Sequence, residues 1–279
     1  MSYGRFPAMG TKVVAWGVHD LWRLRRWFAE VETTCSRFDP DSEVSRINRS
    51  GLSSHHVSDL LAQVLQVGDH ARKISDGVVD IGVGAAVSAW GYDRTFSDVT
   101  DLENRHETPS HRRWGLSGSR LSRGPGTSLD LGGLAKGWSC DVAVERQLAT
   151  VVSAGGDMRS DDPETMASVL DPWGETVARC RLGIGALATS SVVRRSWKVG
   201  GERVSHLIDP RSMAPVDGPV VSASVIAGTA VDAEIGAKTA LILGTGGLSW
   251  ADEQDWIQSA LVVWADGAVY STGASRWAA

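Results

Sequence analysis

The sequence has few cysteines for its length of 279 residues, with only Cys35, Cys140 and Cys180. Their number is odd, and their spacing is not that of known metal-ligand motifs, which argues against a disulfide framework and against a structural zinc site. We therefore expect buried or free thiols, as is typical of proteins in a reducing compartment.

Long hydrophobic runs are also missing. No segment approaches the roughly 20 consecutive apolar residues that a membrane-spanning helix requires. The first residues, MSYGRFPAMGTKVVAW, contain neither the apolar core of a secretion signal nor a cysteine for lipid attachment. We expect a cytoplasmic protein without a membrane span.

There is no excess of basic residues either. The 28 Lys and Arg residues are scattered and outnumbered by 33 Asp and Glu, which gives a formal charge of −5 and makes nucleic acid an unexpected partner. Hydrophobic residues make up 42% of the chain and charged residues 22%, as in globular proteins with a full core. The length allows one large domain or two smaller ones, and no linker decides between them.

Hydrophobic periodicity predicts helices after Asp20 and after Ser58, both of which are typical N-cap residues. Strands dominate the second half of the chain, which ends in a hairpin predicted at Asp266 and Gly267. The pattern indicates an α+β fold with antiparallel or mixed sheets. The buried face of the first helix is predicted to comprise Leu21, Leu24, Trp27, Phe28 and Val31.

The segment SLDLGGLAKGWSCD, residues 128–141, is rich in glycine and contains one lysine. It is not a nucleotide P-loop, because Lys136 is followed by Gly137 and not by a hydroxyl residue. Nor does it match the glycine pattern of dinucleotide-binding domains. Two interpretations stay open: an anion-binding loop, or a strand-to-helix corner in which Asp130 caps the helix.

The segment SHLIDPRS brings His206, Asp209 and Arg211 close together at the predicted end of a strand. These side chains can transfer protons and bind anions, although a lone histidine is often structural. Further on, Glu234 and Lys238 lie four residues apart on a predicted helix. This spacing is typical of a surface ion pair.

Several motifs occur together in one order along the chain, and this ordered set is more specific than any one motif. They are AMGT (8–11), CSRFDPDSEVSRIN (35–48), DIGVGAAVSAWGYD (80–93), DLGGLAKG (130–137), SAGGD (153–157), ATSS (188–191), HLIDPRS (206–212) and AEIGAKTALILG (233–244). The set resembles the ApbE family of flavin transferases. The resemblance implies a single domain over residues 1–279, with two packed mixed or antiparallel sheets flanked by helices and FAD in a cleft between its halves.

The resemblance also implies an activity, that of an FAD:protein FMN transferase assisted by Mg²⁺. Such enzymes cut the pyrophosphate of FAD, pass FMN to a Thr or Ser hydroxyl of an acceptor protein and release AMP. The acceptor carries a Ser/Thr-Gly-Ala-Ser/Thr motif. Two alternatives are an FAD-binding protein without transferase activity and an FAD pyrophosphatase that produces FMN and AMP.

Roles for individual residues follow from the resemblance alone. His206 corresponds to the general base. The positions implied to contact FAD are Met9, Phe38, Val78, Val79, Asp80, Asp130, Lys136 and Ile208, with residues 78–80 expected in a strand. The carbonyl of Gly133 is implied to bind the metal. Where the chain departs from the family, Lys238 is a further candidate for contact with FAD, and the carboxylates of Glu234 and Asp232 are candidates for the metal.

The last helix departs from the family pattern. Family members typically have an Asp and a Thr completing the Mg²⁺ site, whereas this sequence has Glu234 and Lys238. An ammonium group cannot bind Mg²⁺, which takes oxygen ligands. Either Glu234, with Asp232, holds a remodelled metal site, or Lys238 replaces part of the metal's charge.

Overall fold

A computed structural model of the chain describes residues 2–107 and 113–278. They form two compact units. Unit 1 comprises residues 1–28, 136–194 and 218–279, and unit 2 comprises residues 29–135 and 195–217. We describe each unit by itself, and the single domain implied by the resemblance stays a prediction.

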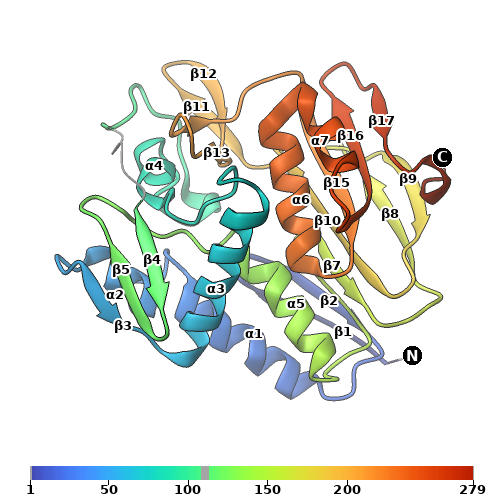
Figure 1. Cartoon of the computed structure of the whole chain (residues 1–279), viewed down its shortest axis with the longest axis horizontal. Helices are drawn as coiled ribbons and strands as arrows, with labels where there is room; N and C mark the ends of the chain where they lie inside the picture. The colour runs from blue at the N-terminus through green and yellow to red at the C-terminus, as the bar shows by residue number, and fades with distance from the viewer. Residues whose placement is uncertain (1, 108–112, 279) are drawn as a thin grey trace. The chain divides into compact units, whose positions relative to one another are not determined.

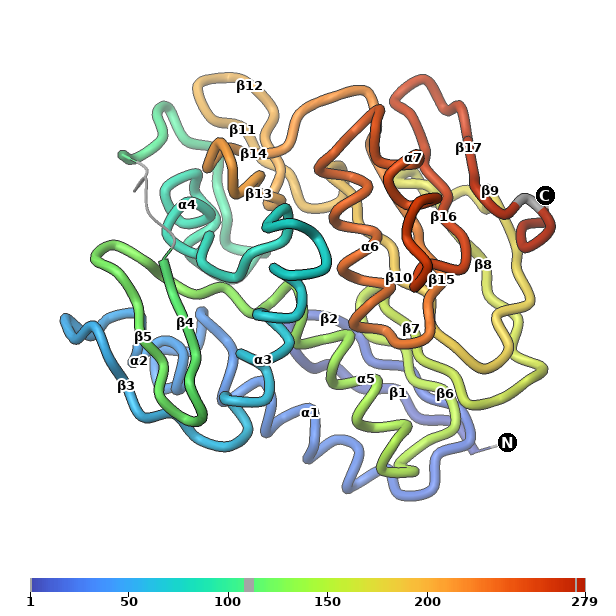
Figure 2. Tube along the Cα trace, in the orientation of Figure 1, coloured from blue at the N-terminus to red at the C-terminus, as the bar shows by residue number. Residues whose placement is uncertain are grey.

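Unit 1 is built on an eight-stranded sheet in which every neighbouring pair of strands is antiparallel (Figures 1 and 2). In sheet order the strands are β1 (Tyr3–Ala8), β2 (Thr11–Trp16), β6 (Val151–Ala154), β7 (Asp157–Ser160), β10 (Gly185–Ser191), β15 (Val220–Ala227), β16 (Ile257–Trp264) and β17 (Val269–Ser271). The hairpin β8 (Met166–Leu170) and β9 (Thr176–Arg181) belongs to the same unit.

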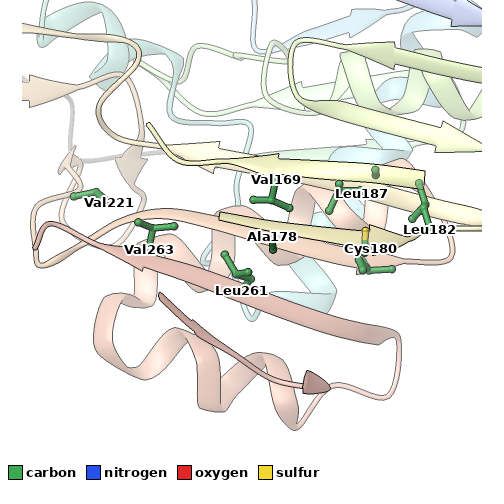
Figure 3. Packing of buried hydrophobic residues seen from close by; sticks show 10 residues of the cluster. Val169, Ala178, Cys180, Leu182, Leu187, Val221, Leu261 and Val263 are labelled. Atoms are coloured by element: carbon green, nitrogen blue, oxygen red, sulfur yellow. The ribbon is translucent and has the colours of Figure 1, made fainter. Parts of the chain in front are cut away.

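Strand β15 lies between β10 and β16 in this sheet, and all of its residues are buried. The helix α6 (Ala230–Leu243) runs beside β10 and β15 (Figure 1). The hairpin β8–β9 contributes Val169 and Cys180 to an apolar cluster with Val221, Leu261 and Val263 from β15 and β16 (Figure 3). Burial of this kind explains why β15 reads as a continuous run of apolar and small residues.

Helix α6 begins at an N-cap with two kinds of support. The Thr229 hydroxyl accepts a hydrogen bond from the Asp232 amide at 3.1 Å. The carboxylate of Asp141, on helix α5 (Ala135–Glu145), accepts hydrogen bonds from the amides of Ala230 and Val231 at 2.8 and 2.9 Å. These amides lie in the first turn of α6 and would otherwise lack hydrogen-bond partners. The two hydrogen bonds to Asp141 therefore link α5 to the start of α6. Helix α7 (Gly247–Asp252) follows α6 in unit 1.

Unit 2 combines helices with small sheets. The helices are α2 (Glu43–Arg49), α3 (Asp59–Ile74) and α4 (Gly84–Ala89), and the strands form one three-stranded and two two-stranded sheets. The strands are β3 (Ser54–His56), β5 (Arg120–Arg123) and β4 (Trp114–Ser117), then β11 (Ser196–Val199) with β12 (Glu202–Ser205), and β13 (Ile208–Asp209) with β14 (Ala214–Pro215). Helix α1 (Leu21–Cys35) belongs partly to each unit.

The predicted α+β class is confirmed, with several sheets in place of two. Helix α1 begins after Asp20, whose carboxylate accepts the Arg23 amide at 2.9 Å, and α3 begins after Ser58 as predicted. The predicted buried face of α1 is correct except at Leu21, which lies in its first turn and is 38% exposed. Gly267 lies in the turn between β16 and β17 with a φ of 88°, as the predicted hairpin requires.

Two other sequence-based expectations concern cysteines and membrane spans. All three cysteines are buried and free of disulfides, as predicted. Over residues 2–107 and 113–278, no helix is long and apolar enough to cross a membrane.

Candidate functional site

Four charged side chains gather in unit 1, and we call them the lysine–carboxylate cluster: Lys136 on α5, Asp157 at the start of β7, and Glu234 and Lys238 on α6. Lys238 Nζ donates a hydrogen bond to Glu234 Oε1 at 2.7 Å. Lys136 Nζ lies 3.7 Å from the same oxygen and 4.0 Å from Asp157 Oδ2. The pair of Glu234 and Lys238 therefore forms as its spacing predicts, but it is part of a larger cluster.

This cluster is buried, which corrects the expectation of a surface ion pair. The side chains of Glu234 and Lys238 are 3% and 14% exposed, and those of Asp157 and Lys136 are 5% and 12% exposed. Glu234 Oε2 and Asp157 Oδ2 are buried without a hydrogen-bond partner. Such carboxylate oxygens are costly to bury, because they lose their contacts with water.

Electrostatics in the cluster favours a protonated carboxyl group. Burial, together with the negative charge of Glu234, raises the pKa of Asp157 to about 7, although Lys136 and Lys238 act in the opposite direction. Burial and the neighbouring carboxylates also raise the pKa of the Cys140 thiol well above its usual range. Cys140 is therefore a protonated, unreactive thiol at neutral pH.

Gly137 explains part of the glycine-rich segment. A Cβ atom at this position would lie 2.8 Å from Glu234 Oε2 and 3.0 Å from the carbonyl oxygen of Ala230. Only a glycine lets α5 approach α6 closely enough to bring Lys136 to Glu234. Residues 136–137 thus serve to pack two helices around charged groups.

The cluster does not fit the magnesium site that the resemblance implies. Mg²⁺ takes an octahedral shell of oxygens at about 2.1 Å, so an ion on Glu234 Oε1 would lie within about 5 Å of the Lys238 ammonium. The other oxygen, Oε2, faces the backbone at Gly137. Among the residues that the structure describes, no group of three or more His, Cys, Asp or Glu side chains is arranged to hold a metal.

The other two candidate metal-binding positions are Asp232 and Gly133. The Asp232 carboxylate accepts a hydrogen bond from the Thr229 hydroxyl at 2.8 Å, so it supports the N-cap of α6. Gly133 lies half-buried in the turn before α5 and belongs to unit 2.

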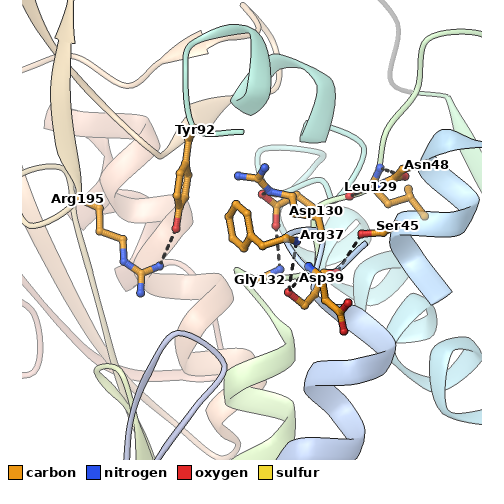
Figure 4. Close-up of polar contacts among 11 residues, drawn as sticks. Arg37, Asp39, Ser45, Asn48, Tyr92, Leu129, Asp130, Gly132 and Arg195 are labelled. Atoms are coloured by element: carbon orange, nitrogen blue, oxygen red, sulfur yellow. Dashed lines mark hydrogen bonds and ion pairs between the residues drawn. The ribbon is translucent and has the colours of Figure 1, made fainter. Parts of the chain in front are cut away.

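A second group of residues lies in unit 2, and we call it the arginine–aromatic cluster: Arg37, Phe38, Tyr92, Asp130 and His206. The Arg37 guanidinium lies 4.2 Å from the ring centre of Phe38 and 4.8 Å from that of Tyr92. Its Nε donates a hydrogen bond to Asp130 Oδ2 at 2.8 Å (Figure 4). The Arg37 side chain is 7% exposed, and its Nη2 has no hydrogen-bond partner.

Asp130 is held in its ionised form. Burial acts to raise its pKa, but the charge of Arg37, the Gly132 amide and His206 outweigh burial and hold the pKa of Asp130 below its usual value. The amide of Gly132 donates to Asp130 Oδ1 at 2.9 Å (Figure 4). Helix α5 begins only at Ala135, so Asp130 stabilises the preceding turn and does not cap the helix, contrary to one of the two sequence-based interpretations.

His206 belongs to the same cluster. Its ring meets the ring of Tyr92 edge-on, with centroids 6.3 Å apart, and its amide donates to the Arg195 carbonyl at 3.2 Å. Arg195 in turn lies 3.5 Å from the Tyr92 hydroxyl (Figure 4). Ile208 is buried in the apolar cluster that also contains Tyr92 and packs against Phe38. Thus three predicted positions, Phe38, His206 and Ile208, come together around Tyr92.

Asp209 and Arg211 form an ion pair with each other. Arg211 binds the Asp209 carboxylate through two nitrogens, with Nη2 at 2.7 Å and Nε at 2.9 Å from its oxygens. The Asp209 carboxylate also accepts the Arg211 amide at 2.8 Å. Arg211 is exposed, and its bonds to Asp209 stabilise the turn between β13 and β14.

Residues 78–80 are not a strand, which corrects the sequence-based expectation. They form bends after α3, where the Val79 amide donates to the Ser75 hydroxyl at 3.0 Å. Asp80 Oδ1 accepts hydrogen bonds from the Gly82 amide and from Trp114 Nε1, each at 2.8 Å. Val78 and Val79 are buried, at 7% and 6% exposed. Local hydrogen bonds to Ser75 and Asp80 therefore replace the expected pairing with another strand.

Met9 lies in the turn between β1 and β2, in unit 1. It has a φ of 53°, a left-handed conformation that few residues other than glycine adopt. Its sulfur lies 3.7 Å from the Ser139 hydroxyl of α5. This contact fixes Met9 against the helix that carries Lys136.

Sequence reasoning did not identify Arg37, Tyr92 or Asp157 as site residues. Arg37 and Tyr92 lie inside two of the motifs quoted above. The pairing of Arg37 with Asp130 is not visible in the sequence, because the two residues are 93 positions apart. Asp157 follows Gly155 and Gly156, for which a tight turn is a sufficient explanation. The signal that could have found these residues is the presence of unassigned charged and aromatic side chains within motifs.

Comparison with known proteins gives one consistent result. The ApbE family profile matches residues 9–261. A protein of Rhodobacter capsulatus named FAD:protein FMN transferase is 32% identical over 252 residues, which are 80% of this chain and 46% of that protein. A Vibrio cholerae protein of the same name is 26% identical over 251 residues, which are 79% of this chain and 72% of that protein.

Solved structures show the same likeness. An ApbE protein from Thermotoga maritima superposes with a TM-score of 0.82 at 23% identity, covering 98% of this chain and 97% of that one. The flavin transferase ApbE from Vibrio cholerae superposes with a TM-score of 0.77 at 25% identity, covering 97% and 96%. The match to the Rhodobacter capsulatus protein spans less than half of that protein's length. The profile match over most of the sequence shows that the chain belongs to the ApbE family.

Proposed function

We propose that this protein is an FAD:protein FMN transferase. The observation that carries the proposal is the family match over residues 9–261, together with relatives of that name in Rhodobacter capsulatus and Vibrio cholerae. FAD is the donor, and an acceptor protein with a Ser/Thr-Gly-Ala-Ser/Thr motif receives FMN. The acceptor oxygen bonds to the phosphorus of the FMN half, the bond from this phosphorus to the bridging oxygen breaks, and AMP leaves with that oxygen.

In this proposal His206 is the general base. It takes the proton of the acceptor hydroxyl as the oxygen attacks phosphorus, and it becomes an imidazolium. The nearby ionised Asp130 favours that positive charge, because opposite charges at short range stabilise each other. Arg37 acts as a positioning residue, since it holds Asp130 in its charged form.

The lysine–carboxylate cluster supplies positive charge. Transfer of a phosphoryl group requires groups that stabilise negative charge on the non-bridging oxygens. Lys136 and Lys238 are suited to this task because their ammonium groups each carry three N–H donors. Met9, Phe38 and Ile208 are the apolar positions that we assign to contact with the flavin. No step of the proposal is assigned to a metal.

Transfer to an acceptor can be measured directly. Incubation with FAD and an acceptor domain that bears the motif should produce a flavin-fluorescent band on a denaturing gel. His206→Gln should reduce labelling at least 100-fold, because general-base catalysis typically contributes about 10²- to 10⁴-fold. His106→Gln is the matched control, since His106 is exposed in the same unit.

Each other outcome identifies a different function. AMP release without labelling of the acceptor would show an FAD pyrophosphatase. Tight binding of FAD without either product would show a flavin-binding protein. Absence of labelling, in a reaction where the Vibrio cholerae enzyme labels the same acceptor, would overturn the proposal.

We also propose a cytoplasmic location. The support is the set of three buried cysteines, all free of disulfides. Cell fractionation with detection of the native protein tests this, and recovery outside the cytoplasmic fraction would contradict it.

A further inference from the structure

Packing alone does not explain the ammonium group of Lys238 in the lysine–carboxylate cluster. Among the described residues it donates a hydrogen bond to Glu234 only, at 2.7 Å. Its side chain keeps 14% of its surface exposed, although Glu234 beside it is 3% exposed. An ammonium group has three N–H donors, so Lys238 retains donors for a further acceptor.

The arrangement of the two lysines around Glu234 is one-sided. Both ammonium groups approach the same oxygen, Oε1, at 2.7 Å from Lys238 and 3.7 Å from Lys136. The other oxygen, Oε2, faces the backbone of α5 at Gly137 and has no hydrogen-bond partner. Both ammonium groups therefore lie near one oxygen of Glu234, and Lys136 lies also 4.0 Å from Asp157 Oδ2.

A divalent cation does not fit beside Oε1 of Glu234. An ion bound to Glu234 would lie close to the Lys238 ammonium, and like charges at such a distance repel each other strongly in a buried site. The two lysines together carry the same formal charge as one Mg²⁺ ion. Unlike the ion, they are attached to α5 and α6 and need not be recruited from solution.

We infer that Lys136 and Lys238 take the place of the divalent cation in this protein, so that it binds the pyrophosphate of FAD without a metal. The inference rests on the proposed function, because it concerns the same ligand. Lysine ammonium groups bind phosphate oxygens as compact point charges. Glu234 orients Lys238 through the hydrogen bond at Oε1. No covalent bond forms or breaks in this step.

The test is FAD binding with the metal-free protein. The protein is dialysed against EDTA, and its affinity for FAD is measured by isothermal titration in EDTA and in excess MgCl₂. We expect dissociation constants that agree within about threefold. Thermal melting provides a second readout, because a ligand that binds only the folded state raises the melting temperature. The rise with FAD should be the same in both buffers.

Two variants connect the result to Lys238. Lys238→Met removes the ammonium but keeps an unbranched chain, and it should weaken FAD binding at least tenfold in EDTA. Lys238→Arg keeps the positive charge and should retain most of the affinity. Lys198→Met is the matched control, because it removes one charge from an exposed position in unit 2. It should bind FAD as the unchanged protein does.

The outcomes separate this inference from the proposed function. FAD binding that requires MgCl₂ would overturn the metal-free mode while leaving the transferase proposal intact. Failure to bind FAD in either buffer would overturn both. If Lys238→Met does not fold, the comparison of EDTA and MgCl₂ with the unchanged protein still decides. Equal loss of affinity in Lys238→Met and Lys198→Met would show that Lys238 has no specific role.

Discussion

Each unit buries a carboxyl group beside a cation, but the surroundings shift the two pKa values in opposite directions. In unit 2 the charge of Arg37 overcomes the effect of burial, and the pKa of Asp130 is lowered. In unit 1 burial and the charge of Glu234 prevail over the two lysines, and the pKa of Asp157 rises to about 7. The difference depends on how each cation is placed.

Arg37 forms a hydrogen bond with its carboxylate at 2.8 Å, and two aromatic rings hold its guanidinium in place. Lys136 lies 4.0 Å from Asp157, beyond hydrogen-bond distance, and shares its charge with Glu234. Direct binding by Arg37 thus offsets the burial of Asp130, whereas the more distant Lys136 does not offset the burial of Asp157. Asp130 in unit 2 therefore stays ionised, whereas the charge of Asp157 in unit 1 changes with pH near neutrality.

The largest expected effect is the pH dependence contributed by Asp157. The folded state keeps a proton on this carboxyl group up to about pH 7, whereas an unfolded chain releases it near the usual aspartate pKa of 3.8. Between these values the folded state binds more protons, so stability falls as the pH rises. A shift of this size corresponds to a loss of up to about 4 kcal/mol.

Urea unfolding at pH 5 and pH 8 measures about 3 kcal/mol of this loss, because the interval covers two of the pH units below the folded-state pKa of about 7. Asp157→Asn should reduce the difference between the two values, and the exposed Asp252→Asn should not. Part of the difference should persist in Asp157→Asn, because burial raises the pKa of Asp141 to about 6. An unchanged difference in Asp157→Asn would contradict the contrast between the units.

The next effect is in unit 2. Arg37→Met leaves Asp130 without its main partner, so we expect a loss of about 3 kcal/mol in the free energy of unfolding. Arg37→Met combined with Asp130→Asn should recover part of this loss, because no unpaired charge then stays buried. Urea unfolding at pH 7 measures both variants.

The control for this prediction is an exposed ion pair in the same unit. Arg94 and Asp93 form a pair at 2.8 Å, but their side chains are 57% and 47% exposed. Arg94→Met should change stability by less than about 1 kcal/mol, since solvent screens such pairs. Equal losses in Arg37→Met and Arg94→Met would show that the rings and burial around Arg37 add nothing.

Local features of the fold could be predicted from the sequence. Asp20 and Ser58 mark the starts of α1 and α3 because N-caps act on amides a few residues away. Gly267 marks a hairpin for the same reason, since the turn depends on one φ angle. The expected strand at residues 78–80 was wrong because hydrogen bonds to Ser75 and Asp80 hold this segment in bends.

The site could be predicted only in part. The spacing of Glu234 and Lys238 predicts an ion pair on one helix, but it contains no information on what covers that helix. Their burial depends on α5 and on Asp157, both distant in the sequence. The pairing of Arg37 with Asp130 is likewise a tertiary contact. Motif order therefore identified the family, while packing determined the electrostatics.

The smallest effect concerns the approach of α5 to α6. In a helix interior, alanine is favoured over glycine by about 1 kcal/mol, so Gly137→Ala would be stabilising if space allowed. The added Cβ would lie 2.8 Å from Glu234 Oε2 and 3.0 Å from the Ala230 carbonyl. This carbonyl belongs to the helix backbone and cannot move aside, so we expect a net loss of about 1 to 2 kcal/mol.

Thermal and urea unfolding measure this loss, and Gly51→Ala serves as control because a Cβ there meets no atom within 4 Å. The lysine–carboxylate cluster should respond as well. If α5 moves away from α6, Lys136 separates from Glu234, and the affinity for FAD should fall with the stability. A Gly137→Ala protein that is as stable as the unchanged one would mean that the helices do not approach as closely as 2.8 Å implies. The one-sided placement of the two lysines would then lose its structural basis, whereas the ion pair of Arg37 and Asp130 in unit 2 would be unaffected.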